Sequence, residues 1–300
     1  MATLPCEDCA TGHLHKGHPR GRVETLHGLP TYITEPSSGA PPKGLVVMIP
    51  DAFGWETPNS RLLCDTYAER ARVLVYLPEF QNGNHLPMSL MKDIGTMTSG
   101  GNSVLTKIPS TLRVVYNMAP YLYLTRPSVT TPGIQSFFTS LRSSSSSVSN
   151  LPVFAVGFCW GGLYAITLTH STSITTEGKP LVDAAFAAHP SNLTIPGDIE
   201  KVERPLSVCQ GTQDFVLDMK GVKQIQQVLE RKNQAGGGDG MAKGRHEIQV
   251  VEGAKHGFAV RGNPEDEVEM AQAQRAEDQA VAWFERWIAE SGEGEGAKAS

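Results

Sequence analysis

Short segments that are apolar at nearly every position recur along this chain, separated by segments with helical periodicity. Residues 44–50, 73–77 and 152–156 are of the first kind. Continuous apolarity is typical of strands buried on both faces, as in a parallel sheet. Residues 59–72 and 264–290 carry apolar side chains at helical spacing instead. Strands that alternate with helices predict an α/β fold, with a mostly parallel central sheet flanked by helices.

The second half of the chain continues this alternation, and one more strand is expected near the N-terminus. The additional strands are predicted at residues 31–34, 182–187, 205–210 and 247–251, and the additional helices at residues 160–170 and 219–232. The 300 residues suffice for one large domain with a substantial buried core.

Composition shifts mark the limits of this domain. Residues 1–24 lack periodicity and are predicted to form an irregular N-terminal arm. Residues 25–290 form a single domain in this interpretation, and residues 81–142 are read as helices inserted over the active site. Residues 291–300 are rich in Gly, Glu and Ala and are predicted to be disordered.

One pentapeptide between a predicted strand and a predicted helix carries the clearest chemical signal. It is Gly157-Phe158-Cys159-Trp160-Gly161, a G-x-nucleophile-x-G arrangement. In that context the nucleophile occupies a sharp strained turn, and the two glycines leave room for strand and helix to approach. The turn also puts the thiol at a helix N-terminus, whose positive end favours the thiolate. Cys159 is therefore the candidate nucleophile, and the alternative is a buried cysteine that packs as a small apolar side chain.

A base and an acid are expected later in the chain, at the carboxyl ends of the last strands. His256 directly follows the last predicted strand and is flanked by Gly257. Asp214 follows the preceding strand and would hold the tautomer of His256. Asp218 is the competing acid, but it stands where a helix N-cap is expected. The predicted catalytic set is Cys159, His256 and Asp214.

Two backbone N–H groups are expected to stabilise a negatively charged oxygen in the transition state. One belongs to Trp160, directly after the nucleophile. The other belongs to Ala52 or the neighbouring Phe53, in the loop after the strand at residues 45–49.

The chain resembles the dienelactone hydrolase family, particularly its fungal members. The residues that carry the resemblance are Gly157-Phe158-Cys159-Trp160-Gly161-Gly162, His256-Gly257-Phe258, Asp214 and Pro50-Asp51-Ala52-Phe53-Gly54-Trp55. The resemblance covers roughly residues 25 to 290. It implies a single-domain α/β-hydrolase fold, a Cys-His-Asp triad, and neither a metal nor an organic cofactor.

The resemblance also implies roles for residues around the thiol. Asp51 stands where the family places an acid beside the resting cysteine, so it is expected to modulate thiol ionisation; the alternative is a loop-capping residue. Independently of the resemblance, Phe53, Arg261 and Tyr123 are candidates for substrate binding. For Tyr123 the alternative is an aromatic side chain that simply packs, and for Arg261 it is a surface salt bridge. Bacterial members hold a substrate carboxylate with two arginines, and this chain departs from that pattern: Glu79-Phe80-Gln81 stands at one position, and Arg261 is displaced by one residue at the other.

Composition bears on partners and location. The formal net charge of −5 gives no electrostatic reason to expect nucleic acid or an anionic membrane as a partner. No apolar run is long enough to span a bilayer, and the odd number of cysteines, five, favours a reducing, cytoplasmic location. A monomer or a homodimer is expected. Cys6, Cys9, His13 and His15 have side chains that suit zinc, although their spacing makes an irregular arm the favoured interpretation.

These features predict a hydrolase that cleaves a small-molecule ester or lactone through a thioester acyl-enzyme. The alternative is a non-hydrolytic protein on the same fold that senses redox state through Cys159 or binds a ligand. A third possibility is transfer of the acyl group to a small nucleophile other than water.

Overall fold

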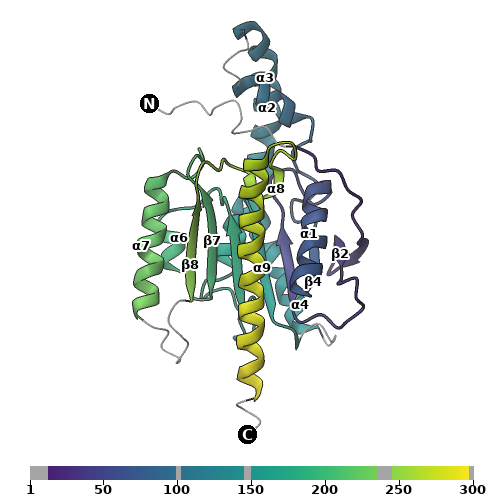
Figure 1. The fold of residues 1–300 in the computed structure, drawn as a ribbon, viewed down its shortest axis with the longest axis vertical. Helices are drawn as coiled ribbons and strands as arrows, with labels where there is room; N and C mark the ends of the chain where they lie inside the picture. Colours follow the sequence, from purple (N-terminus) through teal and green to yellow (C-terminus); the bar gives the residue numbers. More distant parts are fainter. Residues whose placement is uncertain (1–12, 99–102, 145–149, 236–244, 297–300) are drawn as a thin grey trace.

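A single eight-stranded sheet with helices on both faces organises the chain (Figure 1). The computed structural model describes residues 13–98, 103–144, 150–235 and 245–296. The strands are β1 (Arg22–Leu26), β2 (Leu29–Thr34), β3 (Leu45–Ile49), β4 (Leu74–Pro78), β5 (Val153–Phe158), β6 (Ala184–Ala188), β7 (Leu206–Gly211) and β8 (His246–Val251). Their order is β1-β2-β4-β3-β5-β6-β7-β8, and β3 to β8 run parallel.

Helices cover both faces of the sheet. They are α1 (Pro58–Ala71), α2 (Leu90–Thr98), α3 (Val104–Leu124), α4 (Pro127–Ser143), α5 (Trp160–Thr167), α6 (Gly197–Glu200), α7 (Met219–Ala235), α8 (Phe258–Arg261) and α9 (Glu267–Gly296). Successive side chains of a strand point to opposite faces. Val46 and Met48 of β3 accordingly pack with α1 and α9, whereas Val47 and Ile49 pack on the face covered by α4, α5 and α7. The continuous apolar runs are strands buried on both faces, and the predicted α/β architecture is confirmed.

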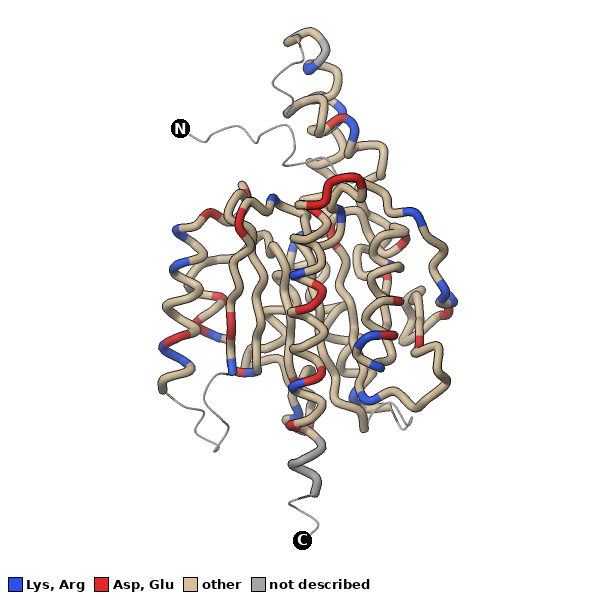
Figure 2. The backbone as a smooth tube through the Cα atoms, in the orientation of Figure 1, with Lys and Arg blue, Asp and Glu red and all other residues tan. Residues whose placement is uncertain are grey.

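From Leu90 on, the described part of the stretch predicted at residues 81–142 is mainly helical. It comprises α2, α3 and α4, and α2 and α3 project beyond one end of the sheet (Figure 1). Phe137 and Phe138 of α4 are buried in the core and anchor the insertion to the sheet. Figure 2 shows few charged residues on α2 and α3, and Arg113 and Asp93 form an ion pair that joins them.

The irregular N-terminal arm predicted over residues 1–24 ends earlier than expected, because β1 begins at Arg22 and pairs antiparallel with β2. The two-residue turn is His27-Gly28, with positive φ angles of 49° and 85°, which is the backbone of a type I′ hairpin. All residues of β1 except Leu26 are exposed, so this edge strand lacks the apolar pattern that identified the others.

The C-terminal prediction also needs a correction. Helix α9 continues to Gly296, so the tail predicted to be disordered over residues 291–300 is helical up to that point. Adding residues to an anchored helix costs far less than nucleating one, so even weak helix formers can extend it. Residues 297–300 lie outside the described part of the chain. None of the helices in the described ranges is long and apolar enough to cross a membrane.

Candidate active site

Cys159 lies on a strained turn between β5 and α5. Its φ of 50° and ψ of −112° are rare for a residue with a side chain. The flanking glycines make the turn possible. A Cβ atom at Gly157 would lie 2.2 Å from the carbonyl oxygen of Gly161, and one at Gly161 would lie 2.1 Å from that of Ile49. The Cys159 backbone N–H donates to the Ala188 carbonyl, which ties the turn to the neighbouring strand β6.

Replacing Gly161 with alanine is therefore expected to lower the free energy of unfolding by about 3 kcal/mol or more, because the new methyl group meets fixed backbone. Gly133→Ala is the matched control. Gly133 lies in α4 with open space around its Cβ position, so this change should stabilise the protein by about 0.5 to 1 kcal/mol. Urea unfolding followed by circular dichroism measures both. Equal stability of the two variants would contradict this account of the turn.

His256 and Asp214 meet at the same edge of the sheet as Cys159. Asp214 follows β7, and its two carboxylate oxygens lie 3.1 and 2.9 Å from Nδ1 of His256. Backbone N–H groups of Val216 and Leu217 donate to Oδ1 of Asp214 and fix the carboxylate. The other side of the imidazole interacts with the thiol of Cys159. The three residues singled out from the sequence thus form a continuous chain of contacts.

Asp218, the competing acid, has a different role. Its Oδ1 accepts the backbone N–H of Gly221 at 2.8 Å, in the first turn of α7. This contact is that of an N-terminal helix cap.

The electrostatics of the site favour a charged pair. Burial alone raises the pKa of the Cys159 thiol, but the nearby His256, the Ser191 hydroxyl and the Trp160 N–H outweigh it and bring the pKa below its usual value. For His256, burial lowers the pKa, but the charges of Cys159 and Asp214 and their hydrogen bonds raise it well above its usual value. The two shifts have opposite directions, and together they favour a thiolate on Cys159 beside an imidazolium on His256.

This pairing has a consequence for pH dependence. Because the pKa of the Cys159 thiol lies below its usual value, the rate at which iodoacetamide alkylates it should reach its plateau at a lower pH than the rate for an unperturbed cysteine. An unperturbed cysteine would still gain reactivity between about pH 7 and about pH 9. Mass spectrometry of the Cys159 peptide, sampled from about pH 5 to about pH 9, separates this thiol from the chain's other cysteines. A profile like that of a free cysteine would contradict the ion pair.

The candidate oxyanion donors lie around the thiol. The Trp160 N–H points at the sulfur, and Ala52 lines the same cavity as Cys159. The sequence left Ala52 and Phe53 as alternatives for the second donor. The Phe53 N–H donates to Oδ1 of Asp51 at 2.9 Å, which leaves Ala52 as the candidate.

The structure gives Asp51 a different partner from the one expected. Its Oδ2 forms a buried ion pair with Arg261, and its Oδ1 accepts from Phe53. Within the described ranges, no hydrogen bond joins Asp51 to Cys159. The reason is electrostatic, since a guanidinium is a far stronger partner for a buried carboxylate than a thiol is. Asp51 therefore caps its own loop through the Phe53 N–H, as the alternative interpretation expects, and its second carboxylate oxygen binds Arg261.

A cavity of about 320 Å³ opens above Cys159. Its walls come from the loop after β3, from helices α2 and α3 of the insertion, and from the loops after β6 and β7. The lining residues are Ala52, Phe53, Leu86, Ile94, Met97, Val114, Met118, Tyr121, Leu122, Cys159, Trp160, Ser191, Asn192, Phe215, Val216, His256 and Arg261. This size is that of a small-molecule site.

Only some of the expected substrate-binding residues lie in the cavity wall. Phe53 and Arg261 line the cavity, but Tyr123 does not. Its side chain is 65% exposed and stacks with Arg126, 4.1 Å from the ring centre. Helical spacing explains the error, because residues two apart on α3 face different directions. Tyr121, two residues earlier, faces the cavity instead.

Sequence reasoning missed Ser191, whose Oγ lies 3.9 Å from the Cys159 sulfur. Ser191 and Asn192 follow β6, the strand next to the one that carries the nucleophile. Their place at the carboxyl end of a parallel strand was the signal available in the sequence. Phe215 and Val216, directly after Asp214, were missed in the same way.

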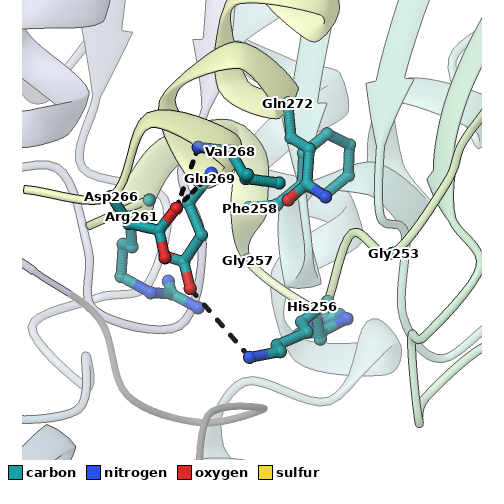
Figure 3. A pocket seen from close by; sticks show the side chains of 11 residues that line it. Gly253, His256, Gly257, Phe258, Arg261, Asp266, Val268, Glu269 and Gln272 are labelled. Atoms are coloured by element: carbon teal, nitrogen blue, oxygen red, sulfur yellow. Dashed lines mark hydrogen bonds and ion pairs between the residues drawn. The ribbon is translucent and has the colours of Figure 1, made fainter. Parts of the chain in front are cut away.

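A second, smaller cleft of about 150 Å³ lies on the other side of His256 (Figure 3). Figure 3 shows His256 and Arg261 among its walls, together with Asp266, Glu269 and Gln272. Lys255 and Glu269 form an ion pair across it, 4.0 Å long. His256 and Arg261 therefore separate an apolar cavity, which contains the thiol, from a polar cleft, which does not.

The N-terminal segment packs near this cleft. His13 N–H donates to the Arg261 carbonyl, and His15 Nε2 lies 2.9 Å from the Gly262 carbonyl oxygen. The other members of the zinc candidate, Cys6 and Cys9, lie outside the described residues. In the described ranges, no group of three or more His, Cys, Asp or Glu side chains is arranged to hold a metal ion.

Comparison with known proteins identifies relatives over almost the whole chain. The model of the dienelactone hydrolase family matches residues 29–288. The hydrolase pyvD of Aspergillus violaceofuscus is 22% identical over 289 residues, which cover 96% of this chain and 99% of the relative. The hydrolase tropI of Talaromyces stipitatus is 24% identical over 294 residues, which cover 97% of this chain and 100% of the relative.

Solved structures share the fold. Dienelactone hydrolase from Anabaena variabilis superimposes with a TM-score of 0.51 at 14% identity and covers 88% of this chain and 97% of its own. Esterase 2 of Thermogutta terrifontis, phosphonylated by sarin, has a TM-score of 0.55 at 14% identity and covers 89% and 96% respectively. The central sheet and its flanking helices are therefore those of an α/β-hydrolase.

Proposed function

The chain belongs to the dienelactone hydrolase family, and on that basis we propose that it hydrolyses a carboxylic ester or lactone of a small molecule through a thioester on Cys159. The observation that carries this proposal is the chain of contacts from the thiol through His256 to Asp214, beneath a cavity of small-molecule size. Fold alone does not determine chemistry, so the proposal depends on the site.

In the first half-reaction, the Cys159 thiolate attacks the carbonyl carbon and the carbonyl oxygen becomes an oxyanion. The N–H groups of Trp160 and Ala52 are the donors for that oxyanion. Collapse of the tetrahedral intermediate breaks the carbon–oxygen bond, and the His256 imidazolium gives its proton to the departing oxygen. The products are an alcohol or phenol and an acyl thioester. With a lactone, both ends remain in one molecule.

In the second half-reaction, neutral His256 takes a proton from water as the water attacks the thioester carbonyl. The carbon–sulfur bond then breaks, and the carboxylic acid leaves while the thiolate–imidazolium pair returns. Asp214 stabilises the imidazolium in both halves and keeps Nε2 of His256 directed at the reacting atoms. A thioester is readily hydrolysed, so this site suits an activated ester or a lactone better than an amide.

Selective alkylation tests this assignment. Hydrolysis of 4-nitrophenyl hexanoate should fall in proportion to the iodoacetamide label found on Cys159; Cys64 and Cys209, the other cysteines of the described residues, are fully buried. Excess ester should protect the thiol. Turnover that survives complete labelling of Cys159 would contradict the proposal. A thiol that peroxide converts to sulfenic acid, in a protein that hydrolyses no ester or lactone, would support redox sensing instead.

A further inference from the structure

The cavity above Cys159 is walled mainly by apolar side chains. The helical insertion contributes Ile94, Met97, Val114, Met118 and Leu122, and Phe215 and Val216 close the opposite side. The neutral polar groups on the walls are those of Tyr121, Ser191 and Asn192. Of the described residues that line this cavity, Arg261 is the one Lys, Arg, Asp or Glu. Cys159 and His256 also line the cavity, but their opposite charges pair with each other, so the charge left for a bound substrate depends on Arg261.

The positive charge of Arg261 is already balanced by the buried carboxylate of Asp51. Its guanidinium pairs with Asp51, and the side chains of the two residues are 13% and 1% exposed. The same guanidinium lies over the Phe53 ring, 4.9 Å from its centre. Asp51 is also fixed by the Phe53 N–H, and its carbonyl accepts from Gln81 Nε2 at 3.1 Å. Both charges of the pair are thus held by further contacts.

We propose that this cavity selects uncharged, apolar substrates, and that an ester or lactone bearing a carboxylate on the part bound there is rejected. This inference rests on the proposed ester or lactone hydrolysis. A carboxylate in the cavity has two outcomes. It loses water without gaining an unpaired cation, because the His256 imidazolium is already paired with Cys159 and Asp214, or it displaces Asp51 and leaves that carboxylate buried and unpaired. Aliphatic and aromatic groups instead match the walls and gain from burial.

Two esters that differ at one end provide the test with the unmodified protein. 4-Nitrophenyl hexanoate ends in a methyl group, and the half 4-nitrophenyl ester of adipic acid carries a carboxylate at that end. The expected kcat/KM for the hexanoate is about 100-fold higher or more, since the carboxylate would be buried without a partner. Equal values, or a preference for the adipate ester, would overturn the inference.

Binding separates this inference from the proposed function. Cys159→Ala removes the nucleophile, so calorimetry can measure the Kd of both esters without turnover. Tighter binding of the hexanoate supports the apolar cavity, whether or not the unmodified protein hydrolyses either ester. Absence of hydrolysis would count against the proposed function and leave the apolar cavity standing. Tighter binding of the adipate ester contradicts the apolar cavity whether or not hydrolysis occurs.

Two variants should weaken the selectivity. Asp51→Asn leaves Arg261 without its carboxylate, so the preference for hexanoate should fall at least about tenfold. Because Asp51 is buried and this variant could fold poorly, Met118→Lys offers an independent route, with Met118→Gln as the uncharged control of similar length. Met118→Lys should lower the hexanoate preference and Met118→Gln should not. An unchanged preference in both charged variants would contradict the inference.

Discussion

Replacing Cys159 with alanine is expected to lower kcat/KM for 4-nitrophenyl hexanoate by about 10⁴-fold or more, with the fold intact. The variant lacks the atom that would carry the acyl group, and His256 cannot replace it. Catalysis by the remaining oxyanion donors and by substrate binding is all that would persist. The strained backbone at residue 159 is set by its flanking glycines and accepts alanine about as well as cysteine.

Cys209→Ala is the matched control for that variant. Cys209 is a fully buried thiol in β7 and packs in the core on the face covered by α9. Deleting its sulfur should cost some stability and leave the rate within a few-fold of the unmodified protein. Thermal unfolding and steady-state kinetics of both variants decide the matter. Undiminished turnover by Cys159→Ala would remove the thiol from the mechanism.

Asp214→Asn is expected to lower kcat by about a thousandfold. An amide keeps the shape of the carboxylate but cannot stabilise the imidazolium. Asp214 and its hydrogen bond both raise the pKa of His256, so that pKa should fall in the variant. A less stable imidazolium also stabilises the thiolate less, so the pKa of Cys159 should rise. The alkylation profile of Cys159 should therefore move to higher pH, a shift that a purely structural role for Asp214 would not produce.

Asp218→Asn makes the same chemical change four residues away. Asp218 caps the start of α7, and asparagine is an equally good cap, so both stability and rate should be nearly unchanged. Comparing the pH profiles and kcat of the two variants identifies the acid. A larger loss in Asp218→Asn than in Asp214→Asn would show that the wrong carboxylate has been assigned.

The sequence predicts an element correctly where the apolar pattern of its residues matches their burial in the folded protein. The strands β3 to β6 are recognised by continuous apolar runs, and β7 and β8 by their place in the alternation with helices. Cys159 is marked by two glycines whose replacement would clash with backbone. In contrast, β1 is an exposed edge strand that pairs through a hairpin, and its polar residues resemble a loop. Pairing between strands supplies the information that its composition lacks.

The position of a site residue was predictable where the sheet topology determines it. The partner of a side chain was not predictable where two partners were possible. His256 and Asp214 follow strands that end at one edge of the sheet, so topology alone brings them near the thiol. Asp51 had two possible partners, the thiol and Arg261, which is 210 residues away in sequence. Only the three-dimensional arrangement reveals that the guanidinium lies within reach.

The covalent intermediate offers the most direct test of the account. The protein would be mixed with 4-nitrophenyl hexanoate, quenched with acid during turnover, digested and analysed by mass spectrometry. The account predicts one hexanoyl group on the peptide that contains Cys159, and its absence from the same peptide in Cys159→Ala. An active enzyme with no acyl group on that peptide, or with the acyl group on another residue, would contradict it.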